Sequence, residues 1–346
     1  MRLARHRWWL ARLAMLPVHL AVFAVAVFFL VRLMPGDPVL TIAGPNAEID
    51  QATYDRIAAD YGFDGSVGEQ LVGYLGGLVG GDLGDSLVSQ TSVAAELSTR
   101  LPATLELVAL GMVVACLTAL VASYIVVTRP RTMVARVLRV WARAAGAVPE
   151  FVIGVALITV TFVWLRIAPA PVGLTDRRTR VGDPVTGAPL LDSVLTGRFD
   201  VTASILAHLW VPLVVMALAF GDLLTKHLVS QLETSIDSPV TRFRAAVGVP
   251  RRRILLSVYR RALPAPVTVL GVMFGALLGG VVLLETLFNF QGLGQYALAA
   301  SNAVDLTALQ GFLLLTAAVS LVVFLVTDIA VMLLDPRRRP GAGGTR

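Results

Sequence analysis

The sequence contains few charged residues for its length. Of its 346 residues only 15% are Asp, Glu, Lys or Arg, whereas 56% are hydrophobic. Soluble domains carry about 25% charged residues, so this chain has too little polar surface to face water on every side. The mean hydropathy of +0.76 points the same way. We therefore expect lipid to cover much of the molecule.

Cysteine, histidine and lysine are also scarce, and each scarcity excludes a kind of site. Cys116 is the only cysteine, which excludes an internal disulfide and a multi-thiolate metal site. The four histidines are scattered without metal-ligand spacing. The only lysine, Lys226, follows Thr225 and does not complete a Gly-Lys-Ser/Thr phosphate loop. The sequence therefore predicts a non-catalytic chain with no metal or cofactor of its own, and disfavours a membrane-embedded enzyme.

Long apolar stretches recur along the chain. A helix crosses the hydrocarbon core of a bilayer with about 20 apolar residues. The stretches that meet this length are residues 9–31, 103–127, 144–165, 204–224, 267–287 and 311–334. The first is longer than the 7–15-residue apolar core of a cleaved signal peptide, which favours a retained span. The expected fold class is an all-α polytopic membrane protein with six transmembrane helices.

Arginines gather in alternate connections between these stretches. They cluster at the N-terminus, in the second and fourth connections and in the C-terminal tail, whereas the first connection is acidic. Cytoplasmic loops carry an excess of Lys and Arg. With an even number of spans, this pattern predicts a protein of the plasma (inner) membrane with both termini in the cytoplasm. The net charge of +6 is then explained by membrane flanks, so we expect no nucleic-acid partner.

The spans divide the chain into three parts. We expect a cytoplasmic N-terminus with the first span (1–31), an extracytoplasmic segment (32–102), and a core with the other five spans (103–346) and a cytoplasmic loop (225–266). The extracytoplasmic segment shows amphipathic patterns around residues 52–61 and 68–78, followed by a glycine-rich stretch. Without a phosphate-loop lysine these glycines are expected to form turns.

The loop between the fourth and fifth spans contains a predicted short helix. Pro239 suits the first turn of a helix, and Gly248 suits the left-handed position that ends one. Between them Val240, Phe243 and Ala246 recur at helical spacing among arginines. Such a helix either lies flat on the membrane or docks into a groove of a soluble partner, and the pattern leaves both open.

Several motifs together resemble one family. They are Arg32-Leu-Met-Pro-Gly-Asp-Pro38, Gly81-Asp-Leu-Gly-Asp-Ser86, residues 100–107, the segment 235–253, residues 263–271, 275–280 and 285–294, Thr327-Asp328, and residues 333–337. In this order they are similar to the dipeptide/oligopeptide (and nickel) permeases, the B-type inner-membrane subunits of ABC importers. The resemblance spans nearly the whole chain.

The resemblance implies a type I ABC importer permease fold and ATP-driven, binding-protein-dependent import of di- or oligopeptides. It implies a second homologous permease subunit, with which the pathway forms, and two ATP-binding cassette ATPase subunits, which bind ATP and Mg. An extracytoplasmic substrate-binding protein and membrane lipid complete the partners. Relatives that share these motifs leave nickel chelates, glutathione and other small solutes as alternative substrates.

The resemblance also assigns the short helix to an ATPase-coupling loop. The residues that it implies for this contact are Val240, Arg242, Phe243, Arg244, Ala245, Ala246 and Gly248. The wider superfamily often has Glu-Ala-Ala where this chain has arginine followed by two alanines, which puts the detailed ATPase contacts in doubt.

Three acidic residues of the spans are candidates for the pathway or its gate: Glu106, Glu150 and Glu285. Charge inside a membrane is costly and by default functional. Solvation at the interface or an arginine partner would satisfy Glu106 and Glu285, which lie near span ends. Glu150 follows Pro149. Relatives have serine or valine after this proline, so a carboxylate at position 150 is unusual.

A secondary transporter or channel is the rival class. It would be favoured by paired charges at mid-membrane depth and by inverted repeats, and the sequence shows neither. The lack of a phosphate loop in turn assigns ATP hydrolysis to separate subunits.

The arginine pattern makes a testable prediction of topology. After Cys116→Ser, single cysteines replace Asp60, Asp183, Arg251 and Arg338. A membrane-impermeant thiol reagent added to intact cells should label the first two positions and not the last two, because the positive-inside bias places only the first two outside. Labelling at Arg251 but not at Asp60 would reverse the topology.

Overall fold

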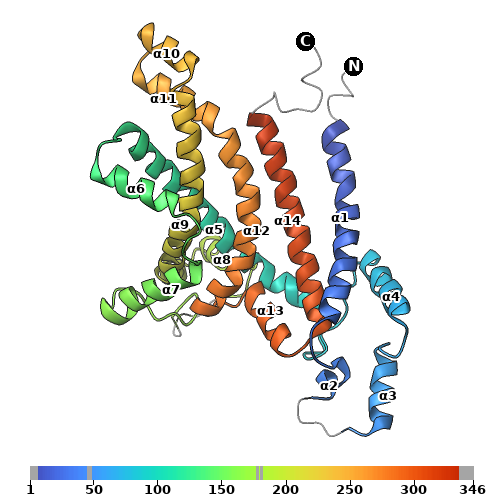
Figure 1. Cartoon of the computed structure of the whole chain (residues 1–346). Helices are drawn as coiled ribbons and strands as arrows, with labels where there is room; N and C mark the ends of the chain where they lie inside the picture. The colour runs from blue at the N-terminus through green and yellow to red at the C-terminus, as the bar shows by residue number, and fades with distance from the viewer. Residues whose placement is uncertain (1–6, 45–48, 177–178, 180–181, 335–346) are drawn as a thin grey trace. The chain divides into compact units, whose positions relative to one another are not determined.

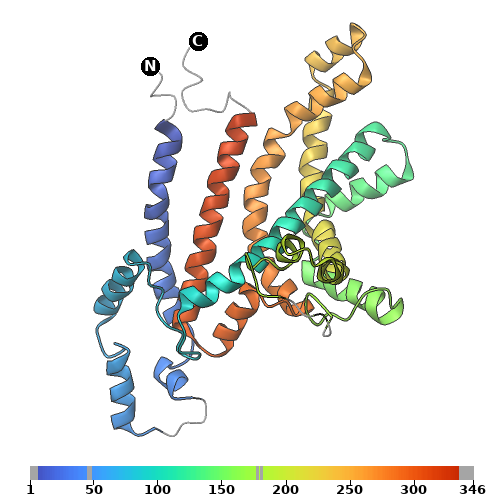
Figure 2. The same ribbon diagram turned by 180° about the vertical axis from the view of Figure 1, so that it is seen from behind.

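The structure of the chain is a computed structural model that describes residues 7–44, 49–176, 179 and 182–334. These residues form helices and turns without a β-strand; an isolated antiparallel bridge joins Asp85 to Ser92. Figure 1 and Figure 2 show the helices from opposite sides. In chain order they are α1 Arg7–Arg32, α2 Pro38–Ala43, α3 Gln51–Asp60, α4 Val67–Val79, α5 Val93–Thr128, α6 Met133–Arg143, α7 Glu150–Ile158, η2 Thr159–Trp164, α8 Pro189–Leu195, α9 Phe199–Ile236, α10 Pro239–Ala246, α11 Arg251–Ala262, α12 Pro264–Phe288, α13 Leu293–Asn302 and α14 Leu306–Leu334.

Five helices are long and apolar enough to cross a membrane. They are α5, α9, α12 and the larger parts of α1 and α14. Each contains one of the expected apolar stretches, so the all-α membrane fold is confirmed. Two of them run well past those stretches: α5 begins at Val93 and α9 continues to Ile236.

The remaining expected span, residues 144–165, is shorter in the structure. Its helical part is α7 followed by the π-helical turn η2, ending at Trp164. At 1.5 Å per residue this is about 22 Å, less than the hydrocarbon thickness of about 30 Å. The chain is not helical between Arg143 and Glu150, because Gly146 takes a φ of 75° and Pro149 has no N–H to donate. The count of six spans is therefore not confirmed.

Helices α6 and α7 both pack against α9, at different positions along it. Near the end of α6, Trp141 would lie 3.4 Å from a methyl group added at Gly221 of α9. The α7 residue Gly154 lies close to Val215, six residues earlier in α9. Both views agree that α6 lies nearer to α10 than α7 does (Figure 1; Figure 2). The two helices thus pack against successive parts of α9 and are joined by the turn around Gly146.

The chain forms two compact units. The first contains the described residues up to Thr104 together with Gln291–Leu321. The second contains Leu105–Phe290 and the described residues from Val322 onward. The extracytoplasmic segment predicted from the sequence lies in the first unit, and the predicted coupling loop lies in the second.

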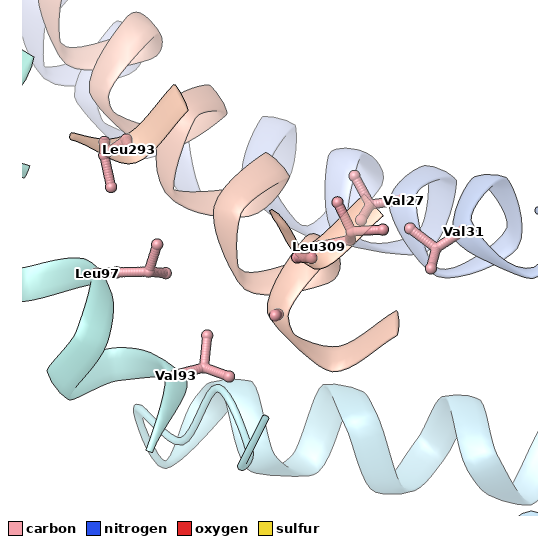
Figure 3. Packing of buried hydrophobic residues seen from close by; sticks show 8 residues of the cluster. Val27, Val31, Val93, Leu97, Leu293 and Leu309 are labelled. Carbon is pink, nitrogen blue, oxygen red and sulfur yellow. The ribbon is translucent and has the colours of Figure 1, made fainter. Parts of the chain in front are cut away.

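The first unit has its own apolar core. Figure 3 shows Leu309 next to the α1 residues Val27 and Val31, with Leu97 of α5 and Leu293 farther along the same cluster. Each of these side chains is less than a tenth exposed. Between membrane spans such side chains attract one another through close van der Waals packing. These contacts join the first span to segments nearly 300 residues later in the chain.

The glycine-rich motif of the first unit packs on the start of α14. Gly84 takes a φ of 78°, and a methyl group there would lie 2.8 Å from Thr307 Cγ2. Two residues later, Ser86 Oγ donates a 2.5 Å hydrogen bond to the carboxylate of Asp305. Asp305 is 2% exposed and also accepts from Ala308 N at 3.0 Å, as an N-cap does. Gly80, Gly81 and Gly84 therefore turn the chain, as the sequence predicts, but Gly76 and Gly77 lie within α4.

Ser86→Ala tests this anchoring. Ser86 Oγ accepts from the amides of Val88 and Ser89 and donates to a buried carboxylate. Hydrogen bonds to charged groups contribute about 1.5–3 kcal/mol, so these two amides should exchange hydrogen about 10 to 100 times faster in the variant. Ser98→Ala, on the exposed face of α5, is the control and should change neither amide. Unchanged exchange in Ser86→Ala would show that the serine does not hold this loop.

Candidate functional site

The predicted coupling helix lies beyond the end of α9. Figure 1 and Figure 2 both show α10 and α11 at that end. An apolar cluster joins α9 to α11: Leu228 and Leu232 contact Val258 and Ala262, and none of the four is more than 3% exposed. The loop is therefore a folded extension of a membrane span.

The boundaries of α10 are those that the sequence predicts. Pro239 occupies the first turn, where its missing N–H costs nothing. The helix ends at Ala246, and Gly248 takes a φ of 78°, a left-handed conformation that costs other residues about 1–2 kcal/mol. The short helix is confirmed.

One face of α10 is held by hydrogen bonds. Thr241 is 7% exposed, and its hydroxyl donates to Ser235 O at 2.7 Å. From α11, Arg261 donates to the hydroxyl oxygens of Thr241 and Ser238. The sequence analysis did not assign these residues a role. The available signal was the pair of serines, Ser235 and Ser238, shortly before Pro239.

Arg244 stands where the wider superfamily often has glutamate. Its side chain also points toward α11. Its guanidinium donates to Ser257 Oγ of α11. The side chain therefore braces α10 against α11 within the same chain. Replacement of an acidic residue by arginine at this position is compatible with the fold, because α11 supplies the acceptor.

The other face of α10 is apolar and exposed. Val240, Phe243 and Val247 recur at helical spacing and are 50%, 67% and 59% exposed. Arg242, Ala245 and Ala246 are exposed beside them. A short helix fixed on one face and apolar on the other presents a surface that a partner can cover.

Glu106 holds the start of a helix. Its two carboxylate oxygens accept from Leu190 N at 2.9 Å and Leu191 N at 2.7 Å, in the first turn of α8. The free N–H groups of a helix N-terminus favour a negative charge. The structure thus gives Glu106 a positioning contact that the sequence did not reveal; its part in the pathway stays a prediction.

Asp192 fixes the loop that precedes α8. Its carboxylate accepts from the backbone N–H groups of Val185, Thr186 and Gly187 at 3.1, 2.8 and 3.0 Å, and from Thr186 Oγ1 at 2.6 Å. Burial raises the pKa of Asp192, but these four hydrogen bonds together outweigh it and hold the pKa below its usual range. Two acidic side chains, Glu106 and Asp192, therefore order this segment.

Glu285 and Glu150 lie on different sides of α12. Glu285 is 1% exposed within the helix. Glu150, the first residue of α7, lies against Gly280, where an added methyl group would be 2.6 Å from its Oε1. Five residues separate Gly280 from Glu285, a rotation of about 140°. The structure does not bring the three candidate glutamates together at one point, and no group of His, Cys, Asp or Glu among the described residues could hold a metal ion.

The chain matches a known family over residues 108–340, described as the binding-protein-dependent transport system inner membrane component. It is 30% identical to the probable D,D-dipeptide transport system permease protein DdpB of Escherichia coli (strain K12), over 92% of this chain and 93% of that protein. It is 28% identical to the dipeptide transport system permease protein DppB of the same strain, over 90% and 92%. It is 31% identical to the di/tripeptide transport system permease protein DppB of Pseudomonas aeruginosa (strain UCBPP-PA14), over 90% and 92%.

These similarities agree with the molecule described above. The family match covers most of the chain, including α10 and α12. The apolar helices are those of a multi-pass plasma membrane protein. The chain therefore belongs to the binding-protein-dependent transport system inner membrane components and is a permease subunit of an ABC importer.

Proposed function

We propose that this permease imports di- or oligopeptides. The three relatives described above are named for the transport of dipeptides or di- and tripeptides, and they match nearly the whole chain. The translocation pathway would form between this chain and a second, homologous permease subunit. Nickel chelates, glutathione or another small solute are alternatives within the same importer class, and a secondary transporter or channel is the alternative outside it.

The energy would come from two ATPase subunits that bind ATP and Mg. The chain contributes no phosphate loop, and its single lysine lies within α9. The observation that carries the proposal is the two-faced α10: Thr241 and Arg244 tie it to its own chain, and Phe243 faces outward. A groove on the ATPase would receive the outward face.

The contacts of α10 with the rest of its chain suggest how closing of the ATPase dimer would move the membrane spans. Arg261 links α10 to α11, and the apolar cluster links α11 to α9. Helix α9 has 38 residues and is itself a span. A displacement of α10 would therefore move a span as a rigid element, in a hinge or shear transition. In this arrangement α10 and both termini lie in the cytoplasm, and the binding protein delivers solute from outside.

Phe243→Ala tests the docking. Removal of a buried aromatic anchor from an interface costs about 2 kcal/mol or more, so substrate-stimulated ATP hydrolysis by the assembled transporter should fall about 30-fold. Phe199→Ala is the matched control, because Phe199 is 71% exposed but lies at the opposite end of α9. Ala246→Trp should cause the same loss, since a large side chain would hold the two surfaces apart.

Contact of α10 with lipid predicts the opposite pattern. In that case Arg242 and Arg251 would attract anionic lipid, and their joint replacement would matter more than either docking substitution. Normal stimulated hydrolysis by complexes carrying both Phe243→Ala and Ala246→Trp would contradict docking. Membrane insertion and protein level are measured in parallel, so that a folding defect is recognised.

A further inference from the structure

Glu150 lies at the depth of the hydrocarbon core. Its neighbour Gly280 is about 24 Å from Pro264, where α12 begins, and about 12 Å from Phe288, where α12 ends. Because α12 is a span, a carboxylate beside Gly280 is well inside the bilayer. An acidic side chain near the middle of a span costs about 2.5–3.5 kcal/mol on insertion scales, and such residues mark solute pathways.

The local structure accommodates a negative charge there. Glu150 is the first residue of α7, where the free N–H groups and the helix dipole favour an anion. The glycine at position 280 leaves room for the carboxylate, because a methyl group there would lie 2.6 Å from Glu150 Oε1. Among the residues that the structure describes, Glu150 has no hydrogen bond or ion pair through its side chain. The fold holds the carboxylate in place but does not neutralise it.

The exposed face of α12 next to Gly280 combines small residues with Val272 and Leu283, which are 63% and 48% exposed. Ala276 and Gly279 are exposed, and a methyl group added at Gly275 or Gly279 would meet no atom within 4 Å. Small residues on a span allow another backbone or a solute to approach closely. Glu150 itself is only half-buried, so its side chain remains accessible beside this face.

A fixed anion at this depth favours a particular class of solute. A zwitterionic peptide carries its own counter-charge, whereas a peptide with an additional lysine or arginine carries a net positive charge. A net charge loses most of its solvation in an apolar passage, and an opposite charge within a few ångströms offsets that loss strongly at low dielectric. A carboxylate that forms no ion pair with any of the described residues is suited to this task.

We propose that Glu150 binds the cationic side chain of a transported peptide as it passes the start of α7, and so favours import of net-positive peptides. This rests on the proposed peptide import. Glu150 is then a specificity-determining residue of the permease, acting in addition to the choice made by the binding protein.

The test uses the assembled transporter in proteoliposomes with its binding protein saturated by peptide. The measured quantity is the ratio of the uptake rates of Ala-Lys-Ala and Ala-Gln-Ala. The two peptides have the same termini, so the contribution of the termini cancels in this ratio. Glu150→Gln should lower this ratio about tenfold, the effect of a difference of about 1.4 kcal/mol. Gly280→Ala, which displaces the carboxylate, should lower it too, and the double variant should add nothing further.

Glu233→Gln is the matched control. Glu233 is an exposed α9 residue that pairs with Arg139 at 3.7 Å, and its loss should leave the ratio unchanged. An unchanged ratio in Glu150→Gln, including equal loss of both peptides, would overturn the inference. Loss of the second permease from the purified Glu150→Gln complex would also overturn it, because the carboxylate would then belong to the subunit contact. Failure of the wild-type complex to import either peptide would instead reject the proposed peptide import on which the inference rests.

Discussion

The second unit depends on the packing of one long helix against the others. Helix α9 contacts α6, α7, α8, α10, α11 and α12. It can do so because the helix continues beyond its apolar stretch as far as Ile236, so the backbone stays helical from the membrane to the loop. Leu228 and Leu232, beyond the expected end of the span, then become the anchor for α11. Helices α6 and α7 and the loop that contains α10 all take their positions from α9.

Elements defined by local chemistry could be predicted from the sequence. The five confirmed spans follow from apolar runs of sufficient length. The ends of α10 follow from Pro239 and Gly248, whose backbone preferences are strong and local. The shortened third span shows where this approach failed: the apolar run was long enough, but Gly146 and Pro149 interrupt the helix inside it. A hydropathy window does not respond to such interruptions.

Contacts between distant residues could not be predicted. Glu106 accepts from amides 84 and 85 residues later in the chain, and Ser86 donates to a carboxylate 219 residues away. No periodicity in the sequence encodes such pairs, because each depends on how separate helices pack. The same limit applies to α10. The pattern showed that the helix could be amphipathic, but the buried and exposed faces were decided by Ser235 and Arg261 outside it.

The two faces of α10 serve different purposes: one is exposed to a partner, and the other attaches the helix to its own chain. If the outer face recognises an ATPase, residues such as Phe243 can change together with the partner's groove without disturbing the inner hydrogen bonds. The inner residues Thr241 and Arg261 bind each other within their own chain, so they are constrained by the fold and not by the partner. Paralogous transporters in one cell could thus diverge in their choice of ATPase through a few exposed substitutions. The mechanical linkage to the membrane would be inherited unchanged.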